Sequence, residues 1–218
     1  MNVSIRHSHP ILPYIIPFAT FLAFTGLASY TPLSSLWLYP LKTIITGILL
    51  IWFRRSYGEI KPKFSFLASL LGLLVFAIWI IPTGYYPLLG TPKNISPYEL
   101  AGSSQIVANI WIFFRMIGAV VVVPIMEELF WRSFLIRYLI NPDFKSVPIG
   151  KFSWLSLIAT VILFGVEHNQ WLPGIIASIL YTLLLYRTKS LSACILAHSI
   201  TNLALGIYVL LTHQWIYW

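Results

Sequence analysis

The stretch Leu191–Trp218, LSACILAHSITNLALGIYVLLTHQWIYW, contains no lysine, arginine, aspartate or glutamate. A helix needs about 20 apolar residues to cross a hydrocarbon layer about 30 Å thick, so this stretch is long enough to span a membrane. Two other runs, Ile11–Leu41 and Phe64–Pro92, also lack formal charge. In lipid every backbone N–H and C=O needs an internal partner, which a helix provides within one segment. The sequence therefore predicts an all-α, multi-pass membrane protein.

The composition of the whole chain supports this class. Of its 218 residues, 58% are hydrophobic and only 9% are charged, whereas about a quarter of a soluble domain is charged. The formal charge of +8 does not indicate nucleic-acid binding, because the basic residues form short clusters beside apolar runs, as in loops on the cytoplasmic side of a membrane. The single cysteine, Cys194, excludes an intrachain disulfide.

Apolar periodicity and length predict a helical bundle of about 7–8 spans. We expect one transmembrane domain over residues 1–218, with the chemistry-bearing motifs within 106–212. The first span should be retained rather than cleaved as a signal peptide, because no small-residue cleavage site follows it. The loop 54–63 should be cytoplasmic and 83–102 should face the other side. The candidate spans are 11–29, 35–53, 64–81, 106–123, a shorter piece at 125–140, 152–167, 172–186 and 190–212.

The region Gln105–Ile140 is too long for one ordinary crossing. Pro124 lies in its middle and removes a helical hydrogen bond, so a kink or break is expected there. One crossing places Lys145, Lys151, Arg187 and Lys189 on the cytoplasmic side, and two crossings place them outside. The distribution of basic residues favours one long, bent or tilted span.

Three groups of polar residues interrupt the apolar pattern. They are Glu127–Arg132 (EELFWR), Phe164–His168 (FGVEH) and His198–Asn202 (HSITN). An ionisable residue near the middle of a bilayer costs about 2.5–3.5 kcal/mol on insertion scales, so such residues are functional candidates.

Helical spacing relates these residues to one another. Glu128 and Arg132 are four apart and can pair on one helix face, whereas Glu127 points about 100° away from Glu128 and can face another neighbour. His198 and Asn202 are also four apart and should point into the same space. The sequence thus predicts that a carboxylate, two imidazoles and an amide converge inside the bundle.

These groups suit hydrolysis. A carboxylate assisted by a neutral imidazole can take a proton from water, and a second imidazole and an amide can donate hydrogen bonds to an oxyanion. Each group also has a structural interpretation: Glu128–Arg132 as a buried ion pair and His198–Asn202 as interhelical hydrogen bonding. Glu167 is expected at the interface or beside the site. Arg115 is expected to pair with a carboxylate or to reach the surface.

The three motifs resemble EExxxR, FxxxH and HxxxN of the CPBP intramembrane proteases, which include the CAAX-processing endopeptidases. The segments NPDFKSVPIGKFSW and LYRTKSLSACILAHSITNLALGIYVLLTHQWIYW resemble the bacterial CAAX protease-related proteins associated with exosortase/PEP-CTERM systems. The resemblance implies a glutamic-type endopeptidase in which Glu127 activates water with His168. His198 and Asn202 would form the oxyanion site, and Glu128 and Arg132 would support it.

The resemblance also implies a setting: a bacterial inner membrane, a membrane-anchored protein or peptide substrate, and an exosortase-system protein as a candidate partner. No cofactor, metal or nucleic acid is expected. Two alternatives stay open. The first is a metal-dependent protease, although HExxH is absent. The second is a non-catalytic membrane protein, either a transporter or an immunity factor that binds a partner.

Overall fold

The computed structural model describes residues 9–27, 35–91, 94–102 and 104–218, and within these residues it contains helices and no strands. The longer helices confirm the predicted all-α bundle. They are α2 (Leu12–Leu27), α3 (Ser35–Phe53), α4 (Phe66–Ile80), α6 (Gln105–Ile117), α9 (Trp154–Val166), α10 (Trp171–Thr188) and α11 (Leu191–Thr212). The end of the predicted span 11–29 and part of the predicted loop 83–102 lie outside the described residues.

Among the described residues, four helices are long and apolar enough to cross a membrane. They are Leu36–Ser56, Gln105–Tyr138, Trp171–Thr188 and Leu191–Thr212, and they are joined by the shorter apolar helices α2, α4 and α9. Large apolar side chains on the outer faces stay exposed, among them Ile51, Leu70 and Leu211. An outer surface of this kind suits lipid rather than water. The chain is an integral membrane protein.

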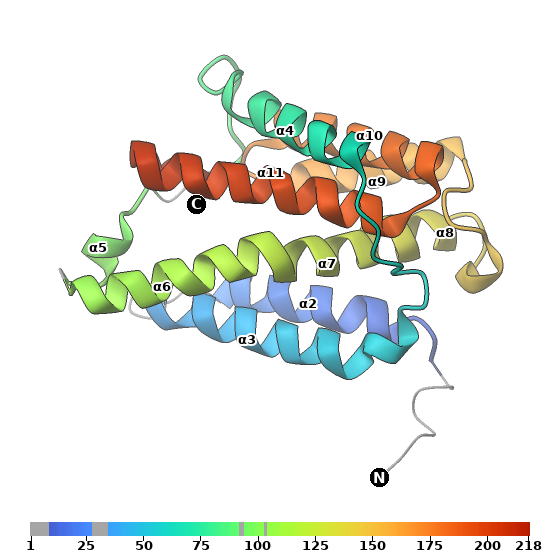
Figure 1. Ribbon diagram of the computed structural model, residues 1–218, viewed down its shortest axis with the longest axis horizontal. Coiled ribbons are helices and arrows are strands. Elements are labelled where there is room, and N and C mark those ends of the chain that lie inside the picture. The colour runs from blue at the N-terminus through green and yellow to red at the C-terminus, as the bar shows by residue number, and fades with distance from the viewer. Residues whose placement is uncertain (1–8, 28–34, 92–93, 103) are drawn as a thin grey trace, which may run out of the picture.

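The segment from α6 onward forms one helix of 34 residues, Gln105–Tyr138. It passes through η3 (Gly118–Val122), α7 (Val123–Glu128), η4 (Leu129–Leu135) and α8 (Ile136–Tyr138), and both η3 and η4 are π-helical. Figure 1 shows it as a continuous ribbon through the centre of the bundle. The preferred prediction of one long span is confirmed, and the separate piece at 125–140 is wrong. Wider π-helical turns accommodate Pro124 without a break.

The other helices pack around this central helix. α2 pairs with α3, α9 with α10, and α4 with α11. The crossing of α4 and α11 depends on Gly72, because a Cβ at this position would lie 2.5 Å from the Ala197 carbonyl oxygen. Thr201 of α11 donates a hydrogen bond to the Gly72 carbonyl at 2.8 Å. Small residues at helix crossings allow such close backbone contacts in membranes.

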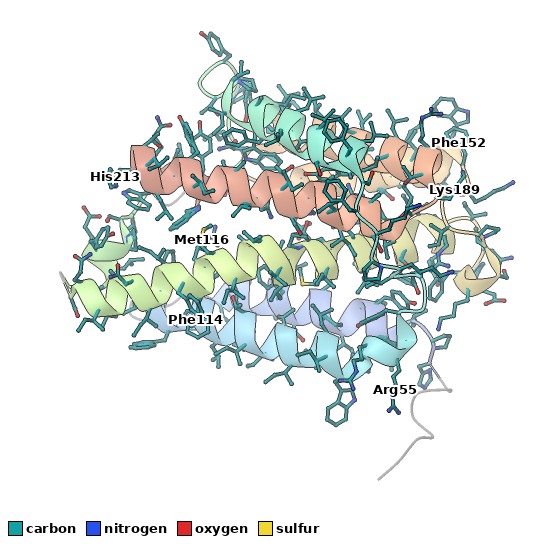
Figure 2. All side chains as sticks on the ribbon, in the orientation of Figure 1. Arg55, Phe114, Met116, Phe152, Lys189 and His213 are labelled. Atoms are coloured by element: carbon teal, nitrogen blue, oxygen red, sulfur yellow. The ribbon has the colours of Figure 1, made fainter. Side chains whose placement is uncertain are left out.

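The basic loops gather at one end of the bundle. Figure 2 shows Arg55 and Lys189 at that end and His213 at the other. Behind the loops lies a buried polar cluster that the sequence did not predict: Arg137 pairs with Glu59 at 3.2 Å, and Tyr14 donates to Glu59 at 2.9 Å. Ser133 also contacts Glu59. The cluster joins α2, the loop after α3 and the central helix, and so closes this end.

Candidate active site

A cavity of about 590 Å³ lies between the central helix, α2, α3, α11 and the turn after α9. Glu127, His168, His198 and Asn202 all line it. The structure therefore brings together the four residues that the sequence predicted to converge. Glu128 and Arg132 do not line the cavity; both side chains are fully buried behind its wall.

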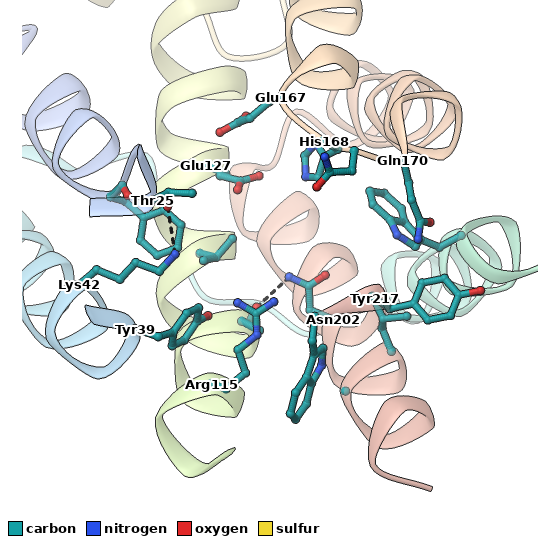
Figure 3. Close-up of a pocket in the computed structure, with 18 of the residues that line it drawn as sticks. Thr25, Tyr39, Lys42, Arg115, Glu127, Glu167, His168, Gln170, Asn202 and Tyr217 are labelled. Atoms are coloured by element: carbon teal, nitrogen blue, oxygen red, sulfur yellow. Dashed lines mark hydrogen bonds between the residues drawn. The ribbon is translucent and has the colours of Figure 1, made fainter. Parts of the chain in front are cut away.

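Glu127 projects from α7 into the cavity and is only 5% exposed. Its Oε2 is buried and has no hydrogen-bond partner among the described residues. Glu167, at the end of α9, lines the same cavity, and its Oε2 is also buried without a hydrogen-bond partner among the described residues. A buried carboxylate without a partner is costly, and such groups in folded proteins call for an explanation. Both carboxylates are therefore available for chemistry, and Glu127 is the one that faces His168 (Figure 3).

His168 faces Glu127 from the turn between α9 and α10 (Figure 3). Its Nδ1 lies 2.8 Å from the carbonyl oxygen of Phe164. A carbonyl oxygen only accepts hydrogen bonds, so Nδ1 carries the proton and the neutral ring keeps Nε2 as an acceptor. No direct hydrogen bond joins His168 to Glu127 in the described part of the chain. The two side chains thus face each other as an acceptor imidazole and a carboxylate.

Glu128 organises the polar layer behind the cavity. Its Oε1 accepts from Arg132 Nη1 at 3.3 Å, and its Oε2 lies 3.3 Å from Arg132 Nε. The predicted pairing four residues apart is confirmed. The same Oε1 lies 2.9 Å from His198 Nδ1, a contact that the sequence did not reveal. Glu128 therefore holds the His198 ring, which also stacks on Tyr181 with centroids 5.2 Å apart.

Asn202 satisfies a backbone group that Pro124 leaves unpaired. Within η3 the N–H of Val123 bonds to the Gly118 carbonyl, five residues back. The next residue, Pro124, has no N–H, so the Ala119 carbonyl has no donor at the corresponding position. Asn202 Nδ2 donates to this carbonyl at 2.8 Å. One amide hydrogen of Asn202 is thus committed to the central helix, and the other remains available to the cavity.

Two cations in the cavity differ from the sequence-based expectation. Arg115 neither pairs with a carboxylate nor points to the surface: it lines the cavity, with Cζ 4.4 Å from the ring centroid of Tyr39. Lys42 was not predicted as a site residue. It is 8% exposed and donates to Thr25 at 3.0 Å. Its position in a long apolar segment was the available signal, because charged residues in such segments are rarely without a role.

Within the described part of the chain, no group of three or more histidine, cysteine, aspartate or glutamate side chains is arranged to hold a metal ion. His168 and His198 belong to different hydrogen-bonded units, one joined to Phe164 and the other to Glu128. The side chains at this site accordingly suit acid–base chemistry by a carboxylate and an imidazole.

A family model matches part of the chain. Residues 109–204 match the family model described as type II CAAX prenyl endopeptidase Rce1-like, a match that covers less than half of the chain. The matched segment contains Glu127, His168, His198 and Asn202. It supports the predicted likeness to CAAX-processing proteases at the level of this family domain. No curated protein and no solved structure matches the chain.

Proposed function

We propose that this protein is an intramembrane endopeptidase that hydrolyses a peptide bond of a membrane-anchored protein or peptide. One observation carries the proposal: the carboxylate of Glu127, buried and without a partner among the described residues, faces the acceptor side of His168 across a cavity inside the bundle. The similarity of residues 109–204 to the Rce1-like endopeptidases supports the same reaction class.

In this mechanism a water molecule binds between Glu127 and His168. Glu127 takes one proton from the water while His168 Nε2 accepts a hydrogen bond from the other, and the water oxygen bonds to the substrate carbonyl carbon. The C–N bond then breaks, and Glu127 returns its proton to the leaving amine. Water is consumed, both products are released, and Glu127 is a carboxylate again.

His198 and Asn202 are the proposed donors to the oxyanion. Glu128 holds His198 by Nδ1, which leaves Nε2 as the ring nitrogen toward the cavity. When that nitrogen carries a proton, it donates to the oxyanion together with the second amide hydrogen of Asn202. Glu128 and Arg132 then act by positioning, since neither lines the cavity.

The cellular setting is part of the proposal. We place the protein in a bacterial inner membrane, with a substrate or partner from an exosortase-type system. The resemblance of the segments 141–154 and 185–218 to proteins of such systems suggests that setting, and its test is whether the tail of such a protein is cleaved.

The proposal is tested by incubating purified protein in lipid with a pool of membrane-anchored peptides. Wild type, Glu127→Gln and His168→Ala are compared, each with and without a chelator. Glu99→Gln is the matched control, because this carboxylate caps the short helix α5 (Pro97–Leu100) and is not among the residues that line the cavity. Loss of a general base lowers the rate by about 10²–10⁴-fold, so the two site variants should lose nearly all activity.

Each outcome has a defined meaning. Cleavage by wild type and Glu99→Gln that resists the chelator supports the metal-free mechanism. Cleavage abolished by the chelator replaces it with metal-assisted hydrolysis. Equal cleavage by Glu127→Gln and wild type refutes the assignment of the base, and no cleavage by wild type favours a binding protein.

A further inference from the structure

The cavity extends away from the basic loops. Its lining includes Thr25 near the end of α2, Tyr39 near the start of α3, and Trp218 at the C-terminus. These residues lie toward the end of the bundle opposite Arg55 and Lys189 (Figures 1 and 2). Loops rich in lysine and arginine stay on the cytoplasmic side of a membrane. The basic loops thus mark the cytoplasmic end, and the cavity extends toward the other side.

Two cations stand on this side of the cavity. Lys42 Nζ lies 4.5 Å and Arg115 Cζ 4.4 Å from the ring centroid of Tyr39, so one ring adjoins both (Figure 3). Thr25 accepts a hydrogen bond from Lys42, and the Trp218 ring lies 5.9 Å from Arg115 Cζ. Arg115 Nε is buried and has no hydrogen-bond partner among the described residues.

Neither cation has an acidic partner within the described part of the chain. The sequence contains six acidic residues, and all are described. The terminal carboxylate of Trp218 forms no ion pair with either cation among the described residues. Glu59 and Glu128 are paired with other arginines, and Glu99 caps α5. Asp143 lies in the loop after α8, at the end of the bundle that carries the basic loops. Glu127 and Glu167 line the cavity near His168. Two cations in a partly desolvated wall repel each other and are stabilised by an anion between them.

The separation of Arg115 from Glu127 along the central helix limits the length of substrate that can lie between these two side chains. Arg115 and Glu127 are twelve residues apart on the same helix, or about 18 Å at 1.5 Å per residue. This is the separation of the two backbone positions, and the Arg115 side chain reaches into the same cavity as Glu127. An extended peptide advances about 3.3–3.6 Å per residue, so at most about five residues span this distance.

We propose that Lys42 and Arg115 form a subsite for a carboxylate of the substrate, within about five residues of the bond that is cleaved, on the non-cytoplasmic side. The inference rests on the proposed protease function and names its substrate class. The carboxylate belongs either to the C-terminus of the substrate or to an acidic side chain. Arginine and lysine both bind carboxylates through charge-assisted hydrogen bonds, arginine often with two in parallel.

The test uses one membrane-anchored peptide that wild type cleaves, made with a free C-terminal acid, as the C-terminal amide, and as the amide with aspartate as its last residue. Loss of a hydrogen bond to a charged group weakens binding about 10- to 100-fold. We expect the plain amide to show a KM higher by this factor at similar kcat. Activity restored by the aspartate peptide assigns a side-chain carboxylate, and activity confined to the free acid assigns the C-terminus.

The variants are Lys42→Met, Arg115→Met and the charge-preserving Lys42→Arg, with exposed Arg55→Met as the control. The two methionine variants should lose the preference for the acid, whereas Lys42→Arg and Arg55→Met should keep it. An unchanged preference in both methionine variants overturns the subsite while the protease function stands.

If wild type cleaves no peptide, a binding measurement tests the carboxylate subsite separately from the protease function. Glu127→Gln is then titrated with fluorescent acid and amide peptides, with and without Lys42→Met. A preference for the acid that needs Lys42 supports the subsite even without cleavage. Equal affinities for acid and amide overturn it.

Discussion

Replacing Asn202 by leucine should destabilise the protein much less when Pro124 is also replaced by alanine. Asn202 donates to the Ala119 carbonyl, whose usual backbone donor is missing because Pro124 has no N–H. Leucine has a similar size but cannot donate, so the variant leaves this carbonyl unpaired in an apolar bundle. Alanine at position 124 restores a backbone N–H one turn away, which can take over the bond.

The magnitude follows from the single lost bond. A buried carbonyl left without a partner costs about 1–3 kcal/mol in soluble proteins, and interhelical hydrogen bonds in membranes contribute about 0.6–1.7 kcal/mol. We therefore expect Asn202→Leu to lower the free energy of unfolding by about 1–2 kcal/mol in the native background. With Pro124→Ala the same change should cost less than about 0.5 kcal/mol, so the coupling is about 1 kcal/mol.

Four proteins measured in the same detergent complete the cycle: wild type, both single variants and the double variant. A difference of 1 kcal/mol shifts the melting temperature of a chain of this size by about 2–4 °C, which thermal unfolding resolves. The effect of Pro124→Ala on the helix itself cancels in the cycle. Equal destabilisation by Asn202→Leu in both backgrounds would refute the link between the proline and the amide.

Two further predictions concern packing and orientation. Gly72→Ala should lower the free energy of unfolding by about 1–3 kcal/mol, because its Cβ would lie 2.9 Å from Cβ of Ile200. Gly26→Ala is the control: no atom lies within 4 Å of its Cβ, so the melting temperature should be unchanged or slightly raised. In a background without the native cysteine, Tyr85→Cys should react with a membrane-impermeant maleimide on intact cells, and Lys61→Cys only after lysis. The reverse labelling pattern would place the cavity opening in the cytoplasm.

Much of the bundle follows from local properties of the sequence. The span predicted at 35–53 coincides with α3, and that at 190–212 differs from α11 by one residue, because both are long apolar runs with polar residues at their ends. The pairing of Glu128 with Arg132 was also predictable, since it depends only on helical spacing. Such features need no knowledge of how the helices pack.

Features that depend on packing were not predictable. The bond from Glu128 to His198 joins residues 70 positions apart, and the pair Glu59–Arg137 joins residues 78 apart. The single long span through Pro124 was predicted from the distribution of basic residues, but the bond that stabilises it was not: an amide from α11 satisfies the carbonyl that the proline leaves free. Tertiary partners decided these features, and helix propensity alone would have placed a break there.

Along the central helix, the charged residues nearer its start have no ion-pair partner among the described residues, and those nearer its end form ion pairs. Arg115 and Glu127 have no ion-pair partner in the described part of the chain and line the cavity. Glu128, Arg132 and Arg137 form ion pairs and are shielded from it. Breaking a buried pair leaves an uncompensated charge, which is strongly destabilising, whereas removing a charge that has no partner leaves none behind.

Substitutions of the paired charges on this helix should therefore affect stability, and substitutions of the unpaired charges should affect turnover. Substitutions at Arg132 or Arg137 should reduce the yield of folded protein before any effect on catalysis can be measured. Neutral substitutions at Arg115 or Glu127 should preserve folding, because they remove an unfavourable buried charge, and should act on substrate binding or on the rate. The paired charges lie toward the end of the bundle that carries the basic loops, and the unpaired charges line the cavity.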